Sequence, residues 1–146
     1  MYESCTFFGH RDSGMQIKEK LKEHIENLIV KKDVKTFFVG NNGNFDFMAY
    51  TALKELKKIY NYIEYYVVLA YMPTERKDEF YDYSDTLLPD FIENVPPRYA
   101  IDKRNRWMIE KSNYVISYVY RKYGGAYKFY EIAKKKNKVV TNLAEK

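Results

Sequence analysis

The sequence predicts an α/β fold, a Rossmann-like three-layer sandwich with a mainly parallel sheet of about five strands. Short runs of β-branched and aromatic residues alternate along the chain with segments of helical apolar spacing. Strands that alternate with helices pair in parallel through right-handed crossovers, which place helices on both faces of the sheet. With 146 residues and 46% hydrophobic content, the chain suits one domain that buries its own core, so we expect a single domain over residues 1–146.

The first half of the chain contains two predicted strand–turn–helix units. A strand over Ser4–Gly9 precedes a helix over about Met15–Val30, in which apolar residues recur three and four positions apart. A second strand over Lys35–Gly40 leads through a turn rich in Asn and Gly to a second helix, which ends near Tyr60. Asn44 is expected to be the N-cap of this second helix.

The second half begins with the most hydrophobic segment, Ile63–Tyr71, which predicts a strand buried on both faces in the middle of the sheet. Residues 73–97 contain all four prolines and predict a long excursion with one short helix near residues 77–83. The remaining predicted elements are a helix over about Ile101–Lys111, a strand over Tyr114–Tyr118, a helix that ends near Lys136 and a strand over Lys138–Asn142.

Composition narrows the class of protein. The net charge of +5 favours phosphorylated or polyanionic partners, although the lysines are spread along helical faces as ordinary solvated surface. A single cysteine, Cys5, excludes an internal disulfide and indicates a buried thiol. No apolar stretch approaches the roughly 18 residues that span a bilayer and no leader follows Met1, so we expect a soluble cytoplasmic protein. We expect no metal centre, because the sequence has no Cys/His cluster, and we expect no cofactor.

The most informative stretch is the glycine pair that opens the last predicted helix. In parallel sheets of this kind, ligands bind beyond the carboxyl ends of the strands. Gly124 and Gly125 stand between a strand and a helix, where unpaired backbone N–H groups and the helix dipole favour an anion. Glycine also lets the backbone approach a ligand closely. We therefore expect phosphate at this turn, and a plain tight turn is the alternative.

Two other strand ends carry polar candidates. Gly9 permits a sharp exit from the first strand, and His10 and Arg11 follow it as possible anion contacts. For His10 the alternative is a turn residue that bonds to local backbone. Asp46 falls in the first turn of the second helix, where it either complements the helix dipole, bonds a ribose hydroxyl or orients Arg11.

Further ligand contacts are expected from residues near the other strand ends and the neighbouring helices. Tyr71 suits a position beside a base, or else caps the core. A guanidinium makes paired hydrogen bonds to phosphate, which suits both Arg98 and Arg104. The other candidates are Gly40, Asn41 and Gly43 after the second strand, Met108 on the same helical face as Arg104, and Lys128 in the last helix.

Five segments together resemble one known superfamily. They are TFFGHRD, FFVGNNGNFD, VVLAYMP, PPRYAIDKRNRWMIEKSNYVISYV and GGAYKFYEIA. From Thr6 to Leu143 the chain resembles the SLOG superfamily, named for the SMF/DprA and Lonely Guy proteins, and is most similar to its small YpsA-like members. The resemblance implies a Rossmann-like nucleotide-binding fold that is often dimeric, so we expect a homodimer.

The Lonely Guy branch of this superfamily cleaves nucleoside monophosphates at the N-glycosidic bond. Its two characteristic segments match this chain at Arg104 and Met108, and at Gly124, Gly125 and Glu131. If the protein is an enzyme, the resemblance implies that Glu131 and Arg104 are catalytic, with the carboxylate stabilising a sugar cation. Asn105, Tyr127 and Lys128 replace the lysine, glycine and threonine of that branch, which weakens the match to a hydrolase.

The sequence therefore favours a protein that binds a nucleotide or nucleotide-derived phosphorylated ligand at the strand carboxyl ends, as a sensor or processing module. One alternative is a nucleoside monophosphate N-glycosidase of the Lonely Guy type. The other is a nucleic-acid-binding module like DprA, which would need a continuous basic face with exposed aromatic residues.

Overall fold

The computed structural model describes residues 3–71 and 86–145, which form one six-stranded, all-parallel sheet. The strand order is β4-β3-β2-β1-β5-β6. The strands are β1 (Glu3–Gly9), β2 (Val34–Val39), β3 (Glu64–Val68), β4 (Thr86–Leu87), β5 (Tyr114–Tyr118) and β6 (Val139–Asn142). The chain builds outward from β1 to β4 and then returns to the other side of β1, so the order reverses between β1 and β5. Such a reversal is where doubly wound sheets bind their ligands.

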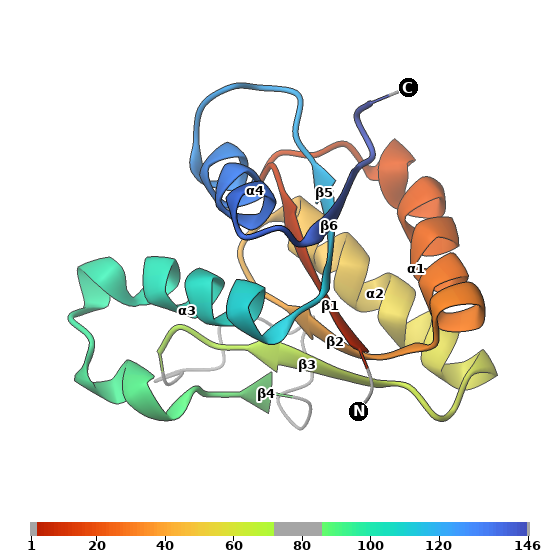
Figure 1. Cartoon of the computed structure of the whole chain (residues 1–146), viewed down its shortest axis with the longest axis horizontal. Helices are drawn as coiled ribbons and strands as arrows, with labels where there is room; N and C mark the ends of the chain where they lie inside the picture. Colours follow the sequence, from red (N-terminus) through yellow and green to blue (C-terminus); the bar gives the residue numbers. More distant parts are fainter. Residues whose placement is uncertain (1–2, 72–85, 146) are drawn as a thin grey trace.

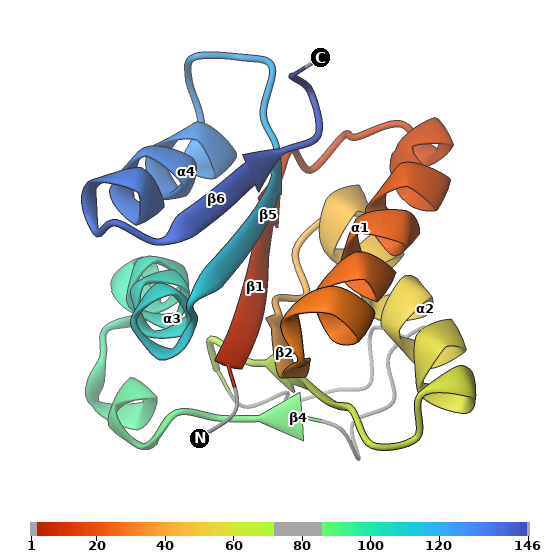
Figure 2. The same cartoon turned by 45° about the vertical axis from the view of Figure 1, so that its right-hand side comes forward.

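Helices cover both faces of the sheet and complete three layers (Figures 1 and 2). One face carries α1 (Lys18–Lys32) and α2 (Asn44–Ile59), and the other carries α3 (Pro97–Lys111) and α4 (Gly125–Lys135). Short 3-10 turns, η1 (Met15–Ile17) and η3 (Asp90–Asn94), precede α1 and α3. The β1–α1 and β5–α4 connections lie together at the top of Figure 2. This arrangement brings two of the predicted ligand-binding turns to one edge of the sheet.

Pairs of adjacent phenylalanines supply the two apolar layers. Successive side chains on a strand point to opposite faces of the sheet. Phe7 and Phe37 therefore pack in the layer beneath α1 and α2, with their rings 6.3 Å apart. Phe8 and Phe38 lie in the opposite layer, where Phe8 stacks on Phe129 of α4 at 5.6 Å. Each Phe-Phe pair in the sequence thus serves both layers at once.

The five predicted strands are confirmed, and the sheet has one more. The strand β4 was missed because its two residues, Thr86 and Leu87, are too few to show an alternation of apolar and polar residues within a proline-rich segment. The helix α3 begins at Pro97, ahead of the predicted Ile101, because proline suits the first turn of a helix. The short helix expected near residues 77–83 lies outside the described residues.

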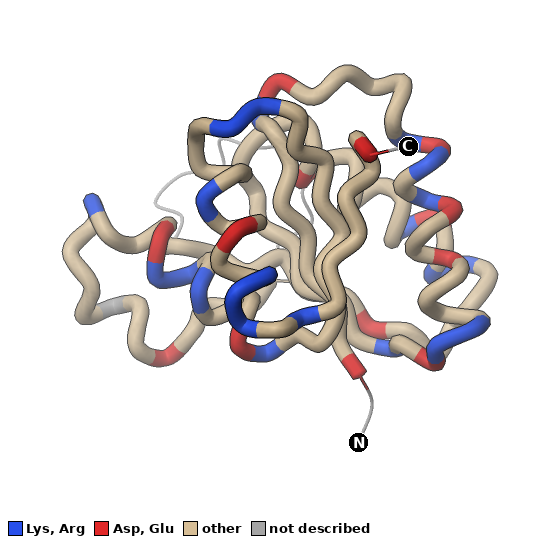
Figure 3. Tube along the Cα trace, turned by 45° about the horizontal axis from the view of Figure 1, so that its top comes forward, with Lys and Arg blue, Asp and Glu red and all other residues tan. Residues whose placement is uncertain are grey.

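Charged residues of both signs are distributed over several elements (Figure 3). Basic and acidic segments alternate along α1, α3 and α4. Within the two described ranges, no helix is long and apolar enough to cross a membrane, and no cluster of three or more His, Cys, Asp or Glu could hold a metal ion. Cys5 is buried as predicted, and its burial raises the pKa of the thiol.

Candidate functional site

Two adjoining hollows lie at the carboxyl end of β1. The main pocket, about 270 Å³, is lined by Phe7, Phe8, Gly9, Arg11, Asn42, Asp46, Ile101, Arg104, Asn105, Met108, Gly125, Ala126 and Phe129. The outer pocket, about 320 Å³, is lined by Gly9, His10, Arg11, Asp12, Arg121, Tyr123, Gly124, Gly125 and Ala126. The two pockets share Gly9, Arg11, Gly125 and Ala126, and these four residues define the shared mouth. The site therefore lies where the strand order reverses.

The start of α4 forms one wall of the shared mouth. Gly124 is the N-cap, with φ of 92° and ψ of 175°, a conformation that is open almost only to glycine. No side chain caps this helix, and its first turn has no acidic residue. A Cβ atom at Gly124 or Gly125 would meet no described atom within 4 Å. The first backbone N–H groups of α4 are thus left open to a ligand.

Arg11 stands opposite this helix start and borders both pockets. It is exposed, and its guanidinium makes no hydrogen bond or ion pair with the described part of the chain. Gly43 packs on the Arg11 backbone, since a Cβ atom at Gly43 would lie 2.6 Å from the Arg11 Cα atom. The backbone of Arg11 is thus fixed while its side chain keeps its donors for a ligand.

Arg104 lies on the floor of the main pocket and is fully enclosed, with 1% of its surface exposed. Its Nε donates to Asn105 Oδ1 at 2.7 Å, and its Nη1 donates to the Val68 carbonyl at 2.8 Å and to Asn41 Oδ1 at 3.3 Å. These bonds tie α3 to the ends of β2 and β3. Much of the Arg104 donor capacity is therefore spent within the protein.

Asp46 faces Arg104 across Gly40. A Cβ atom at Gly40 would lie 2.7 Å from Asp46 Oδ2 and 3.2 Å from Arg104 Cζ, so only glycine lets the two charged groups approach there. The Asn42 backbone N–H donates to Asp46 Oδ2 at 2.9 Å. Burial raises the pKa of the Asp46 carboxyl to about 6, against the opposing effects of Arg104 and the Asn42 hydrogen bond. Its charged neighbour is thus Arg104, whereas the sequence suggested Arg11.

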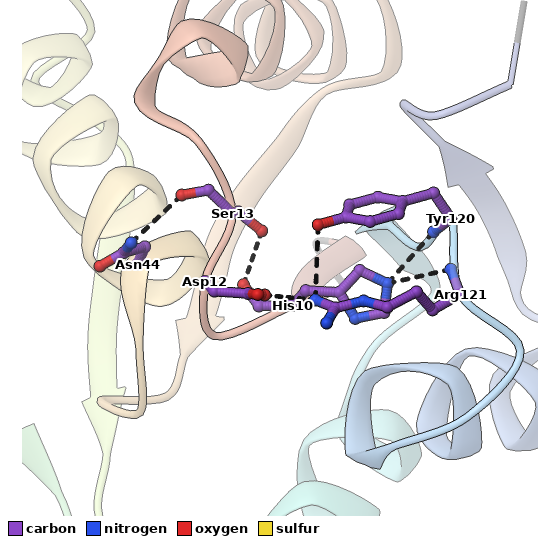
Figure 4. Close-up of polar contacts among 6 residues, drawn as sticks. All are labelled: His10, Asp12, Ser13, Asn44, Tyr120 and Arg121. Atoms are coloured by element: carbon purple, nitrogen blue, oxygen red, sulfur yellow. Dashed lines mark hydrogen bonds and ion pairs between the residues drawn. The ribbon is translucent and has the colours of Figure 1, made fainter.

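His10 holds the loop that leads to α4 (Figure 4). Its Nε2 accepts the backbone N–H groups of Tyr120 at 3.1 Å and Arg121 at 3.3 Å, so the ring is neutral with its proton on Nδ1. Burial lowers the pKa of His10, the positive charge of Arg121 lowers it further, and Asp12 opposes both. Arg121 in turn forms an ion pair with Asp12. The bonds of His10 run to a distant loop, whereas the sequence suggested local backbone or a ligand.

The N-cap prediction for Asn44 was wrong. Gly43, with φ of 100°, is the N-cap of α2, and no side chain caps the helix. Asn44 is the first helical residue, and its Nδ2 instead donates to the Ser13 carbonyl at 3.2 Å (Figure 4). Ser13 Oγ donates to the His10 carbonyl at 2.6 Å. The β1–α1 connection takes the place of a local cap because it lies directly against the start of α2.

Several predicted residues lie away from both pockets. Lys128 pairs with Asp102 at 2.5 Å, and Glu131 pairs with Lys134 at 3.7 Å, so neither lines a pocket. Glu131 follows Phe129 by two positions, which turns it about 200° around the helix from the residue that does line the main pocket. The orientation of α4 explains why this carboxylate lies outside.

Arg98 and Tyr71 also lie outside the two pockets. The guanidinium of Arg98 lies 4.9 Å from the Tyr99 ring centroid, and Tyr71 is 53% exposed. Met108, by contrast, lines the main pocket as expected, on the same face of α3 as Arg104. The structure thus brings together part of the predicted set and leaves these two at the surface.

Sequence reasoning missed the other lining residues: Phe7, Phe8, Asp12, Asn42, Ile101, Asn105, Arg121, Tyr123, Ala126 and Phe129. For Phe129 a signal existed, since it follows Gly125 by one helical turn and therefore shares its face. Ile101 likewise lies three residues before Arg104 on α3. Arg121 had no such signal, because its position depends on an irregular loop.

Comparisons with known proteins agree with this fold. The YpsA family model, described as the YspA SLOG family, matches residues 2–144. No curated protein matches the sequence. DNA processing protein A (DprA) from Streptococcus pneumoniae superposes with a TM-score of 0.68 at 18% identity, over 95% of this chain and 49% of that one.

A second solved structure, of DNA processing protein A from Helicobacter pylori, has a TM-score of 0.67 at 17% identity, over 94% of this chain and 63% of that one. The H. pylori structure concerns the mode in which that protein binds single-stranded DNA. The present chain spans less than two thirds of either protein, and identities this low concern the fold alone. The family match covers nearly the whole chain, and the protein belongs to the YpsA family of SLOG proteins.

Proposed function

We propose that this protein binds a nucleotide or a nucleotide-derived phosphorylated ligand in the main pocket, with phosphate at the shared mouth. The observation that carries the proposal is the open start of α4 opposite Arg11. Backbone N–H groups and the helix dipole favour an anion there. Arg11 adds a guanidinium with no partner in the described chain, which is suited to paired bonds with phosphate oxygens.

The inner part of the main pocket suits a flat ring. Phe8, Met108 and Phe129 supply apolar surface from β1, α3 and α4. Ligand pockets commonly enclose about 300–1,000 Å³, and the two adjoining hollows together reach that range. A base in the inner part and phosphate at the mouth would use both kinds of surface.

Binding without turnover is favoured over N-glycoside hydrolysis. Glu131, the carboxylate expected to stabilise a sugar cation, pairs with Lys134 outside the pockets. Arg104, its expected catalytic partner, is bonded to Asn41, Asn105 and Val68. A sensor or a binding step in a larger process therefore fits this site better than a Lonely Guy-type hydrolase. The expected homodimer stays a prediction.

Nucleic acid is the second class of ligand to test, because the related H. pylori protein binds single-stranded DNA. Lys and Arg residues are interspersed with acidic ones along the described backbone (Figure 3), whereas a nucleic-acid binder uses a continuous basic face. We therefore rank a single nucleotide first. A steep loss of affinity with salt would indicate many phosphate contacts and reverse this order.

A thermal-shift screen of nucleoside mono-, di- and triphosphates, dinucleotides and cyclic nucleotides tests the proposal. A ligand at a hundredfold excess over its Kd stabilises the fold by about 2.7 kcal/mol, a readily visible shift. Each hit is then titrated against Arg11→Ala and against a matched control, Arg98→Ala, which removes an exposed arginine outside the pockets.

We expect Arg11→Ala to weaken binding by about 10-fold or more, the value of one charge-assisted hydrogen bond, and Arg98→Ala to leave it unchanged. Hits should also be assayed for released base. Equal losses of affinity in both variants, or no hit in the whole screen, would contradict the proposal. Release of base would instead indicate N-glycoside hydrolysis.

A further inference from the structure

We infer that the ligand is a ribonucleotide and that Asp46 accepts a hydrogen bond from the 2′-hydroxyl of its ribose. The inference rests on the proposed function and adds the identity of the sugar. Three observations carry it, namely the spare acceptor capacity of Asp46, the position of its helix turn beside Arg11, and the electrostatic effect of Arg104 on it.

Asp46 brings spare acceptor capacity into the main pocket. An ionised carboxylate offers about four lone-pair sites. Within the described chain, the hydrogen bond that Asp46 accepts comes from the Asn42 backbone N–H, at 2.9 Å. A ligand hydroxyl would supply a further donor, whereas a phosphate oxygen would be repelled by the like charge. Among the described ionisable residues that line the main pocket, Asp46 is the one acceptor, beside Arg11 and Arg104.

The position of Asp46 matches the place of a sugar in a nucleotide. The Asn44 backbone N–H donates to the Arg11 carbonyl at 2.8 Å, so the first turn of α2 lies directly beside Arg11. Asp46 belongs to that first turn. A phosphate bound by Arg11 and the start of α4 would therefore place its attached sugar next to Asp46. The base would continue toward Met108 and Phe129 on α3 and α4.

Arg104 keeps this carboxylate in its accepting form. The two charges meet across Gly40, and the buried guanidinium stabilises the ionised state of Asp46. Burial acts in the opposite direction and leaves the pKa of Asp46 at about 6. The preference for ribose should thus be complete at pH 8 and decline as the carboxyl takes up a proton toward pH 5. This decline separates Asp46 from a purely steric filter, which would not depend on pH.

The test compares ribonucleotides with their 2′-deoxy counterparts by isothermal titration calorimetry on the intact chain. The probes are the mono-, di- and triphosphates of adenosine, guanosine, cytidine and uridine, and the matching deoxynucleotides. At pH 8 we expect the best ribonucleotide to bind at least about 10-fold more tightly than its deoxy form, as one hydrogen bond to a charged group implies. Equal affinity overturns the inference without any variant.

Asp46→Ala then assigns the preference to this side chain, because alanine offers no side-chain acceptor. We expect the ratio of ribonucleotide to deoxynucleotide affinity to fall to about one. The matched control is Asp102→Ala, which removes a carboxylate on α3 that pairs with Arg106 and Lys128 outside the pockets and should leave the ratio unchanged. Retained preference in Asp46→Ala overturns the inference. Absence of binding by every nucleotide, ribo and deoxy alike, instead overturns the proposed function and this inference with it.

Discussion

The two helices that begin beside the site, α2 and α4, start in the same backbone conformation and end up in opposite surroundings. Their N-caps are Gly43 and Gly124, with φ of 100° and 92° and extended ψ, and neither helix has a side-chain cap. At Gly43 a Cβ atom would collide with the Arg11 backbone at 2.6 Å, whereas at Gly124 it would meet no described atom within 4 Å. One helix start is packed against the chain, and the other is open.

The charges near the two helix starts differ in the same way. The first turn of α2 carries Asp46, which accepts the Asn42 N–H, while the first turn of α4 has no acidic residue. The positive end of the α2 dipole is therefore complemented by the chain itself. A glycine at a helix start is therefore not by itself a ligand site. What surrounds it decides whether it packs the fold or is free to bind an anion.

Substitution of the two N-cap glycines tests the difference between the starts of α2 and α4 with the largest expected effect. Both occupy a region that costs a side-chain-bearing residue about 1–3 kcal/mol, and Gly43→Ala adds a clash with backbone worth a further 1–3 kcal/mol. We expect Gly43→Ala to lower the free energy of unfolding by about 2–6 kcal/mol and Gly124→Ala by about 1–3 kcal/mol. Urea unfolding measures both. Equal losses would contradict the distinction between a packed and an open start.

His10 links the two regions, and its removal should cost less than the Gly43 substitution. His10→Ala leaves the Tyr120 and Arg121 N–H groups without their acceptor, for a loss of about 1–3 kcal/mol. Its pKa is lowered in the folded state, so the unfolded chain binds more protons below about pH 6.5. The contribution of His10 to stability is therefore complete above pH 6.5 and declines as the pH falls below it.

The pH dependence of His10 is measured as a difference, because Asp46 titrates nearby in the opposite sense. Urea unfolding of the original chain and of His10→Gln at pH 7.5 and 5.5 isolates the histidine, since glutamine keeps an acceptor but does not titrate. We expect the original chain to lose more stability than His10→Gln on acidification. An equal loss of stability in the two proteins would show that protonation of His10 does not weaken its hold on the loop that leads to α4.

Gly125→Ala separates the effect of the α4 start on stability from its effect on ligand binding. Gly125 has no positive φ and open space around its Cβ position, so alanine fits and should stabilise the helix by about 0.4–1 kcal/mol. The added methyl group would obstruct the shared mouth, and we expect phosphate-bearing ligands to bind about tenfold more weakly. Calorimetric titration alongside urea unfolding measures both effects. Unchanged affinity would indicate that the ligand does not approach the start of α4.

Lys128→Ala should have the smallest effect. The sequence suggested a phosphate contact, but the side chain is half exposed and pairs with Asp102. Exposed ion pairs contribute about 0.2–1 kcal/mol, so we expect a stability loss in that range and a change in ligand affinity below about twofold. A tenfold loss of affinity in the same titration would indicate that Lys128 contacts the ligand.

Much of this fold was determined by local sequence pattern. The strand segments, the helical apolar spacing and the Phe-Phe pairs are readable because periods of two and 3.6 residues depend on near neighbours. Asn44 shows the limit of local reasoning, because the cap that its residue type predicts is replaced by contacts from the β1–α1 connection.

Which charged groups remain available for a ligand depends on how the layers pack. Arg11 and Arg104 look alike in the sequence, yet Arg104 is consumed by Val68, Asn41 and Asn105 while Arg11 keeps its donors at the mouth. Glu131 was placed outside the site by the rotation of α4 on the sheet. Hydrogen-bond partners that are distant in the chain come together only when the layers pack. Those partners determine whether a guanidinium or carboxylate can still bind a ligand. Local sequence pattern predicted the fold and the edge of the sheet at which the candidate site lies, and the packing of the layers decides which residues line it.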